Sequence, residues 1–266
     1  MTGVQTCALP IYRSQCVRQM RIGRVFFMGD TAKVVSPFGV RGGNTGIADA
    51  DNLAWKLAAV VRGRAPESLL HTYHDERLEA AQRNVQVTNR TARFLRPTEP
   101  AAQLFRQAAL SLAKKHRFAR NMVNTGRMAE ANTYTRSPAC AGGGVSVQNV
   151  AFRWANRQTG VLNTLLDWAE GCLLLLVFGP IKVAELARLR QLASTTAMLR
   201  VVQVMDPADK PQALEHVIDE KGHVRRACQA TDQLWALVRP DAYLAATGSG
   251  IDAALVRKVG CALTLA

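Results

Sequence analysis

The chain of 266 residues is poor in aromatic side chains, which make up 6%, and it has no long apolar run. Its longest apolar stretch, Cys172–Phe178, is far short of the ~18 residues that a membrane-spanning helix needs. No membrane partner is therefore expected, and the stretch is typical of a buried strand. Hydrophobic residues still make up 48% and charged residues 20%, which favours a packed globular core over disorder.

The six cysteines form no pair at redox spacing, and no histidine follows one of them at zinc-finger distance. The simplest interpretation is that the cysteines are free thiols in the reduced state, which predicts a cytoplasmic protein without a metal site. Cys172 and Cys228 stand alone and are expected to be buried apolar fillers.

Acidic residues are scarce: 34 Lys and Arg against 20 Asp and Glu leave a formal net charge of +14. Much of the excess lies in residues 77–136, with twelve basic and three acidic side chains. Such a surface could attract nucleic acid, anionic lipid or an anionic cofactor. The arginines are not interleaved with aromatic residues, so a solvated helical face is favoured and nucleic acid is not the expected partner. An interaction module that binds nucleic acid or an acidic partner through residues 77–136 stays the alternative function.

The first eleven residues, MTGVQTCALPI, lack the basic start and the apolar core of a signal peptide. VQTCALPI resembles the translation of one frame of a common sequencing adapter. We therefore interpret residues 1–11 as an artefact and expect the natural sequence to begin near Tyr12; a genuine polar leader is the alternative. Codons 2–11 that match no adapter would refute the interpretation.

Apolar periodicity and turn residues predict an α/β chain. A short strand at Arg24–Met28 leads to a loop rich in proline and glycine at residues 36–44. The expected helices are at 47–61, 66–95, 101–122, 181–191 and 252–259, and the expected strands are at 173–178, 199–204, 234–238 and 243–246, with residues 216–218 leading into a turn at 219–222. The second half has the β-α-β, β-β-α order of a small thioredoxin-like domain. The predicted domains are 12–132 and 161–266, with a linker rich in Ser, Pro, Gly and Asn within 133–160.

One segment, Gly29–Asn44, combines a carboxylate at a strand end with a glycine loop before a helix. Asp30 can accept hydrogen bonds from sugar or ribityl hydroxyls. Gly42 and Gly43 let the backbone approach a flat ligand closely. The following helix N-terminus favours an anion, and a reduced flavin is one. Taken singly, a Gly-Asp turn or a glycine pair is more often structural.

Taken together, this region resembles the second flavin motif of the class A FAD-dependent aromatic hydroxylases. The resemblance is strongest to the branch of phenol hydroxylase and 3-hydroxyphenylpropionate hydroxylase. Its strongest blocks are residues 23–30 (GRVFFMGD), 36–44 (SPFGVRGGN) and 46–57 (GIADADNLAWKL), and weaker ones are 73–77 (YHDER) and 237–243 (LVRPDAY). The resemblance implies the C-terminal part of a Rossmann-like FAD-binding domain of the p-hydroxybenzoate hydroxylase type, with long helices, followed by a thioredoxin-like domain.

The resemblance also implies roles for single residues. Asp30 would hold the ribityl chain, and the backbone N–H groups of Gly43 and Asn44 would bind flavin O2. Pro37 would lie beside the isoalloxazine and the substrate, and Arg41 would place positive charge near the pyrimidine ring. The implied catalytic residues are Pro37 and Arg41. The implied cofactor-binding residues are Gly29, Asp30, Pro37, Gly42, Gly43, Asn44 and Thr45.

The implied reaction uses FAD, NAD(P)H and O₂. NAD(P)H would reduce the flavin, O₂ would add at flavin C4a, and one oxygen atom would pass to a small phenolic or other aromatic substrate. The thioredoxin-like domain has no redox pair, so it would be a structural module, with a homodimer through it as one option. A free-standing structural protein of thioredoxin-like fold is a further alternative.

Two features depart from the family. The family usually reads Gly-Asp-Ala-Ala-His, whereas Lys33 stands at the histidine position here, and Ser36 replaces the first of two prolines. Lys33 could pair with an FAD phosphate or simply face solvent. No G-x-G-x-x-G follows a strand near the start, so the ADP-binding βαβ unit is not expected in this chain. We therefore expect the chain alone to bind FAD poorly and to lack hydroxylase activity.

Overall fold

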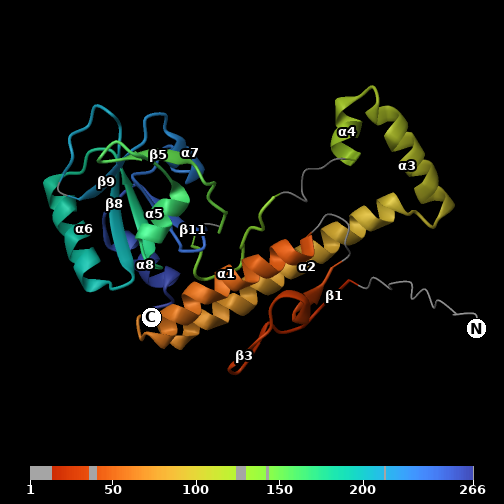
Figure 1. Cartoon of the computed structure of the whole chain (residues 1–266), viewed down its shortest axis with the longest axis horizontal. Coiled ribbons are helices and arrows are strands. Elements are labelled where there is room, and N and C mark those ends of the chain that lie inside the picture. The colour runs from red at the N-terminus through yellow and green to blue at the C-terminus, as the bar shows by residue number, and fades with distance from the viewer. Residues whose placement is uncertain (1–13, 36–40, 124–129, 142–143, 213, 266) are drawn as a thin grey trace, which may run out of the picture. The chain divides into compact units, whose positions relative to one another are not determined.

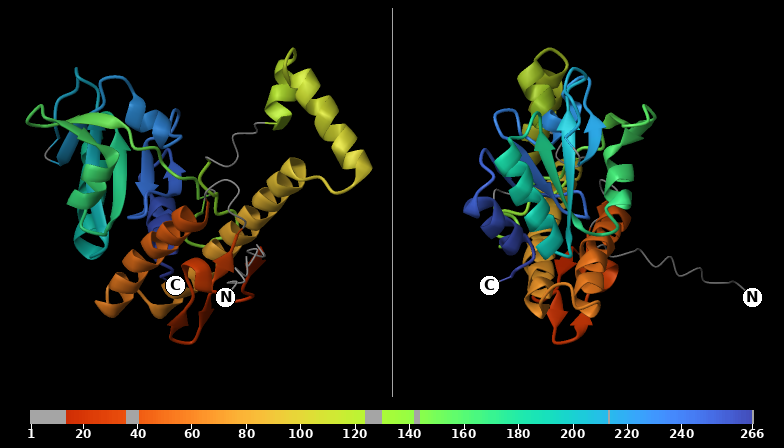
Figure 2. Two further views of the ribbon diagram at one scale, coloured as in Figure 1. Left: turned by 45° about the vertical axis from the view of Figure 1, so that its right-hand side comes forward. Right: turned by 90° about the vertical axis from the view of Figure 1, so that its left-hand side faces the viewer.

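The computed structural model describes residues 14–35, 41–123, 130–141, 144–212 and 214–265 (Figures 1 and 2). The chain divides into two compact units. Unit 1 comprises residues 1–50 and 78–130, and unit 2 comprises residues 51–77 and 131–266. The units are groups of residues in mutual contact, and the predicted domain boundaries remain predictions.

Unit 1 begins with four strands of two residues each. β1 (Gln15–Cys16) pairs with β4 (Lys33–Val34), and β2 (Arg21–Ile22) pairs with β3 (Val25–Phe26), all antiparallel. A 3-10 helix, η1 (Gly29–Thr31), connects β3 to β4.

The strand predicted at Arg24–Met28 is therefore shorter than expected. Gly23 and Gly29 both have φ of +57°, a left-handed conformation that ends a strand and that glycine adopts without steric cost. These two residues limit β3 to Val25–Phe26.

Four α-helices follow, and the first two run through both units. They are α1 (Arg41–Val61), α2 (His71–Leu95, preceded by the 3-10 helix η2, Glu67–Leu70), α3 (Pro100–Ala113) and α4 (Arg117–Val123). α1 starts earlier than predicted, so Arg41–Asn44 form its first turn and not a loop. α2 ends just before Pro97, as predicted from the bias of residues before proline against helix. The single helix predicted at 101–122 is two helices, with a break at residues 114–116.

Unit 2 contains a seven-stranded sheet in the order β11-β10-β7-β8-β9-β5-β6 (Figure 1). Its elements are β5 (Ala151–Trp154), β6 (Thr159–Val161), α5 (Leu162–Trp168), β7 (Leu173–Phe178), α6 (Val183–Thr195), β8 (Leu199–Met205), β9 (Glu215–Ile218), α7 (His223–Ala227), β10 (Trp235–Val238), β11 (Leu244–Gly248) and α8 (Ala253–Ala262). β7, β8 and β9 are parallel, and β10 and β11 are antiparallel. The order β11-β10-β7-β8, with α6 joining the parallel pair, is typical of thioredoxin-like domains.

β7 is buried along its whole length because helices cover both faces of the sheet. Leu173, Leu175 and Val177 pack into a cluster with α6, α8 and the C-terminal half of α1. Leu174, Leu176 and Phe178 pack into a second cluster with α5 and α7. A strand buried on both faces reads as a continuous apolar run, which is why the sequence pattern identified it. Cys172 and Cys228 are both buried, as predicted.

Gly248 in β11 lies against the indole ring of Trp235 on the neighbouring strand. A Cβ atom on Gly248 would stand 2.3 Å from Cζ2 of Trp235, a side chain that is 1% exposed. We expect Gly248→Ala to lower the free energy of unfolding of unit 2 by about 1–3 kcal/mol, as overpacking does in tight cores. Urea unfolding followed by circular dichroism measures this.

The matched control is Gly260→Ala in α8, where the nearest atom to a new Cβ would be the Leu265 carbonyl oxygen at 3.8 Å. Alanine favours a helix over glycine by about 0.5–1 kcal/mol, so this variant should be neutral or more stable. Equal stability of the two variants would contradict the packing described here.

Candidate cofactor site

The turn that carries Asp30 is held against helix α1. Gly29 donates its N–H to Asp49 Oδ2 at 2.9 Å. One helical turn before Asp49, a Cβ atom on Gly46 would stand 3.5 Å from the Cα atom of Gly29. The 3-10 helix therefore lies directly on α1, and the Asp30 side chain, next to this contact, is exposed. An exposed carboxylate on an anchored turn can accept hydrogen bonds from a ligand's hydroxyl groups.

The first turn of α1, Arg41–Asn44, carries the backbone N–H groups of a helix N-terminus. Its residues Arg41, Gly42, Gly43 and Asn44 include no acidic side chain, so none of them compensates the positive end of the helix dipole. Gly43 and Asn44 are exposed. A Cβ atom on Gly43 would meet no atom of the described residues within 4 Å. The packing of the described residues therefore gives no reason for glycine at this position, although glycine weakens a helix.

These two features fit a flavin. The exposed Asp30 carboxylate suits the ribityl hydroxyls. The exposed Gly43 and Asn44 in the first turn of α1 suit the electron-rich pyrimidine edge, and the absence of a side chain at Gly43 leaves room for a flat ring. The Thr45 hydroxyl is buried and donates to the Gly42 carbonyl oxygen at 3.0 Å, and its role in cofactor binding remains a prediction. Pro37 lies outside the described residues, and its role remains a prediction.

Arg41 is buried, with 6% of its surface exposed. Its guanidinium donates to Asn84 Oδ1 on α2 and, at 3.3 Å, to the Glu130 carbonyl oxygen. Burial, reinforced by Arg83, lowers the pKa of Arg41. The side chain thus ties the start of α1 to α2, and a flavin contact from it remains a prediction.

Lys33 does not face solvent, so one of the two interpretations left open for it is wrong. Its side chain is 1% exposed, and its ammonium group forms an ion pair with Asp49, whose side chain is fully buried. The sequence pattern could not reveal this partner, which lies sixteen residues further along the chain. The interpretation as a phosphate ligand would require the ammonium to bind an anion while it is engaged by Asp49.

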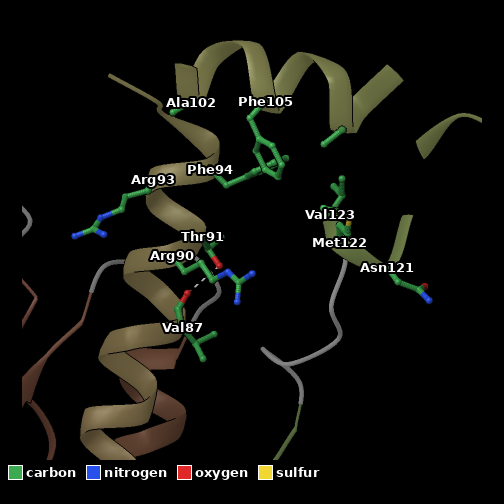
Figure 3. Close-up of a pocket in the computed structure, with 11 residues that line it drawn as sticks. Val87, Arg90, Thr91, Arg93, Phe94, Ala102, Phe105, Asn121, Met122 and Val123 are labelled. Carbon is green, nitrogen blue, oxygen red and sulfur yellow. Dashed lines mark hydrogen bonds between the residues drawn. The ribbon is translucent and has the colours of Figure 1, made fainter. Parts of the chain in front are cut away.

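A groove of about 470 Å³ lies elsewhere in unit 1, among α2, α3 and α4 (Figure 3). Figure 3 shows Phe94 and Phe105 turned toward each other, with Arg90 and Arg93 on the α2 side. Its lining residues are Val87, Arg90, Thr91, Arg93, Phe94, Ala102, Phe105, Ala109, Asn121, Met122 and Val123. The Thr91 hydroxyl is engaged by the Val87 carbonyl oxygen at 3.0 Å. None of these lining residues is an acid, a histidine or a cysteine, so the groove offers shape and apolar contact but no group for acid–base or nucleophilic chemistry.

Unit 2 contains a buried cluster of charged side chains. Glu76 on α2 accepts from Arg239 at 2.6 and 2.9 Å and from Lys56 at 2.7 Å. Arg239 also donates to Asp241 at 2.9 and 2.6 Å. Asn52 donates to Glu76 and Asp241 at 2.6 and 3.0 Å and accepts from Lys56 at 2.9 Å. None of the five is more than 6% exposed.

The stretch predicted as a linker contributes further partners to this cluster. Ser137 donates to Glu76 at 2.5 Å, and Arg239 donates to the Cys140 sulfur at 3.0 Å. Tyr134 accepts from Arg77 at 2.8 Å and stacks on Tyr243 with ring centroids 4.2 Å apart. Residues from three of the blocks that carry the family resemblance, 46–57, 73–77 and 237–243, therefore meet in one structural cluster. The sequence signal for this cluster was that its residues lie in separate blocks that all resemble the same family.

The pKa values of Glu76 and Lys56 in this cluster depend on burial and on the opposite charges around them. Burial raises the pKa of Glu76, but Arg239 and Lys56 outweigh burial and leave this pKa below its usual range. Burial also dominates at Lys56 and lowers its pKa to about 8, against the raising effect of Glu76. Arg77, the first residue of the basic segment, is fully buried, so it contributes nothing to a basic surface.

Among the described residues, no helix is long and apolar enough to cross a membrane. Nor do three or more His, Cys, Asp or Glu side chains of these residues gather in a way that could hold a metal ion.

Comparison with known proteins points to flavin enzymes. A family model described as an FAD binding domain matches residues 8–88. The 6-methylpretetramide 4-monooxygenase of Streptomyces rimosus is 33% identical over 253 residues, which are 89% of this chain and 43% of that protein. CabE, an aromatic hydroxylase from angucycline biosynthesis, has a similar structure with a TM-score of 0.65, 25% identity, and coverage of 94% of this chain and 46% of CabE.

The flavin-dependent monooxygenase PieE, solved with FAD and substrate, shares the fold with a TM-score of 0.71 at 21% identity, over 95% of this chain and 50% of PieE. This chain thus spans half or less of the length of these relatives. The matched segment is that of an FAD binding domain. The predicted resemblance of the chain to the class A FAD-dependent aromatic hydroxylases is therefore confirmed.

The buried cluster predicts the effect of removing its central charge. Glu76→Gln leaves Lys56 and Arg239 buried with less negative charge around them, and we expect the free energy of unfolding to fall by about 3–5 kcal/mol. Chemical unfolding measures it. The matched control is Glu220→Gln, which breaks an exposed ion pair with Arg153 at 2.9 Å and should cost less than about 1 kcal/mol.

The pH dependence has a definite sign. Because the pKa of Glu76 is lower in the folded state, its contribution is present above about pH 4.3, the ordinary value for glutamate, and is lost as the pH falls further. The Glu76→Gln variant should therefore lose less stability than the parent chain between neutral and acidic pH. A steeper acid loss in the variant would contradict this assignment.

Proposed function

We propose that this chain is the flavin-contacting part of an FAD-dependent monooxygenase that uses NAD(P)H and O₂ to hydroxylate a phenolic or other aromatic substrate. The observation that carries the proposal is the Gly29–Asp30 turn anchored to Asp49 on α1, together with the exposed Gly43 in the first turn of α1, where a Cβ atom would meet none of the described residues within 4 Å. Relatives with monooxygenase and aromatic hydroxylase names support the same reaction class.

Each group of residues has a distinct task in this proposal. Asp30 holds the ribityl hydroxyls, and the N–H groups of Gly43 and Asn44 bind the O2 edge of the pyrimidine ring. Bound flavin supplies the redox chemistry with NAD(P)H and O₂, while the protein supplies position and field. The positive N-terminal end of α1 and the positive charge of Arg41, its first residue, favour the anionic reduced flavin over the neutral oxidised form.

The alternative, a basic interaction module at residues 77–136, has less support. Arg77 is buried against Tyr134, and Arg106 donates to the Leu95 carbonyl oxygen at 2.9 Å. The exposed arginines that remain lie mainly on α2 and α4, where Phe118 is also exposed between Arg117 and Arg120. A salt-dependent mobility shift with DNA would favour this alternative.

Gly43 provides a test that separates ligand contact from folding. A methyl group at this position meets no described atom of the chain, so Gly43→Ala should keep or raise thermal stability, by up to about 1 kcal/mol. The same methyl group would stand where the flavin edge is proposed to lie, so flavin affinity should fall about tenfold or more, which equals ~1.4 kcal/mol. Differential scanning fluorimetry and flavin fluorescence titration measure the two effects.

Flavin affinity in this test is measured in a chimera in which this chain replaces the matched part of the Streptomyces rimosus monooxygenase, because the chain alone is expected to bind weakly. Gly260→Ala serves as the control, since α8 has no proposed flavin contact. A Gly43→Ala variant that binds flavin as well as the parent would remove α1 from the proposed site.

The reaction itself is tested with the same chimera. We expect NAD(P)H oxidation that is accelerated by an aromatic substrate, and a product that carries one oxygen atom from ¹⁸O₂ by mass spectrometry. A chimera that retains FAD and oxidises NAD(P)H but releases only peroxide, with every phenolic substrate tried, would contradict the proposed hydroxylation.

A further inference from the structure

Asp49 connects the two elements of the proposed flavin site. It lies on the same helix, α1, as the first-turn residues Gly43 and Asn44, and its side chain is fully buried. Its Oδ2 atom accepts the Gly29 N–H at 2.9 Å and also the ammonium group of Lys33. The two donors lie on either side of Asp30, so one carboxylate holds both ends of the turn Gly29–Lys33.

The same turn is fixed from its other side by backbone contacts. The Val17 N–H donates to the Ala32 carbonyl oxygen at 2.9 Å, and Cys16 pairs with Lys33 in the β1–β4 ladder. Gly46 allows Gly29 to approach α1 closely. The Asp30 carboxylate therefore has little freedom to move relative to the helix, apart from rotation of its own side chain.

Charge balance explains the lysine. A fully buried carboxylate needs a cation or several donors, because an unpaired buried charge is strongly destabilising. The Cys16 thiol also lies near the pair, and its pKa is raised by burial and by Asp49 against an opposing effect of Lys33. A neutral thiol carries no charge to balance Asp49, whereas the Lys33 ammonium group forms an ion pair with it.

We infer that Asp49 is a positioning residue, which sets the place of Asp30 relative to the first turn of α1, and that Lys33 is its charge partner and not a ligand of an FAD phosphate. The flavin part of this inference rests on the proposed function. The anchoring of the turn does not, and it can be measured without any ligand.

The first experiment is amide hydrogen exchange in the full chain, read by NMR at Gly29–Ala32. Lys33→Met keeps the length of the side chain and leaves the buried carboxylate without its cation, while Asp49→Asn removes the negative charge. Each should accelerate exchange at Gly29 by about tenfold or more. The double variant should be less perturbed than Lys33→Met alone, because it leaves no unpaired charge. Lys33→Arg should restore protection to within about threefold of the parent.

Two references make the exchange result decisive. Arg153→Met breaks an exposed ion pair in unit 2 and should leave Gly29 exchange unchanged. The β7 amides report global unfolding. Unchanged Gly29 exchange in both single variants would overturn the inference, and so would an equal loss of protection at Gly29 and in β7, because the pair would then act on the whole fold.

The second experiment reads flavin retention in the chimera, which a merely structural pair would not alter in a folded protein. Lys33→Met should weaken FAD affinity about as much as Asp30→Ala, and Lys33→Arg should restore it. FAD affinity that is unchanged in a Lys33→Met chimera with fast Gly29 exchange would overturn the positioning role. A parent chimera that binds no FAD would instead overturn the proposed function and leave the exchange result standing.

Discussion

The buried carboxylate of Glu76 is the constraint on which unit 2 depends. It cannot be solvated, so the chain must bring positive charge and hydrogen-bond donors to it from distant segments. Lys56 arrives from α1, Arg239 from the turn after β10, and Ser137 from the irregular stretch before the sheet. Each of these segments is held in register by the need to satisfy one group. Apolar packing around Trp55 and Leu69 adds stability but would tolerate more than one arrangement.

A smaller version of the same principle operates in unit 1. There a second buried carboxylate, Asp49, accepts from the Gly29 N–H and from the Lys33 ammonium group. In both places a buried acid on a long helix fixes a turn that local sequence alone would leave adjustable. The helices provide rigidity, and the acids determine which loop residues are held against them.

The sequence predicted those parts of the fold that depend on local pattern. The all-apolar β7 and the helix stop before Pro97 were predicted from residues within a few positions of each other. Short elements with weak periodicity, such as β5 and α7, were not predicted. The environment of Lys33 and the convergence of Glu76 with Arg239 could not be predicted, because their partners lie 16 and 163 residues away. In the candidate site, Asp30 and Gly43 were predicted from family motifs, whereas the role of Asp49 required its contacts.

The cluster around Glu76 also limits how such sequences can recombine. Glu76 and Lys56 are encoded far upstream of Arg239 and Asp241, yet the four charges neutralise each other only as a set. A crossover between two homologous genes anywhere from residue 77 to residue 238 would keep a folded product only if both parents carry complementary charges at these positions. The charge cluster thus restricts which homologous genes can recombine to a folded product. It favours inheritance of the helices and the thioredoxin-like sheet together.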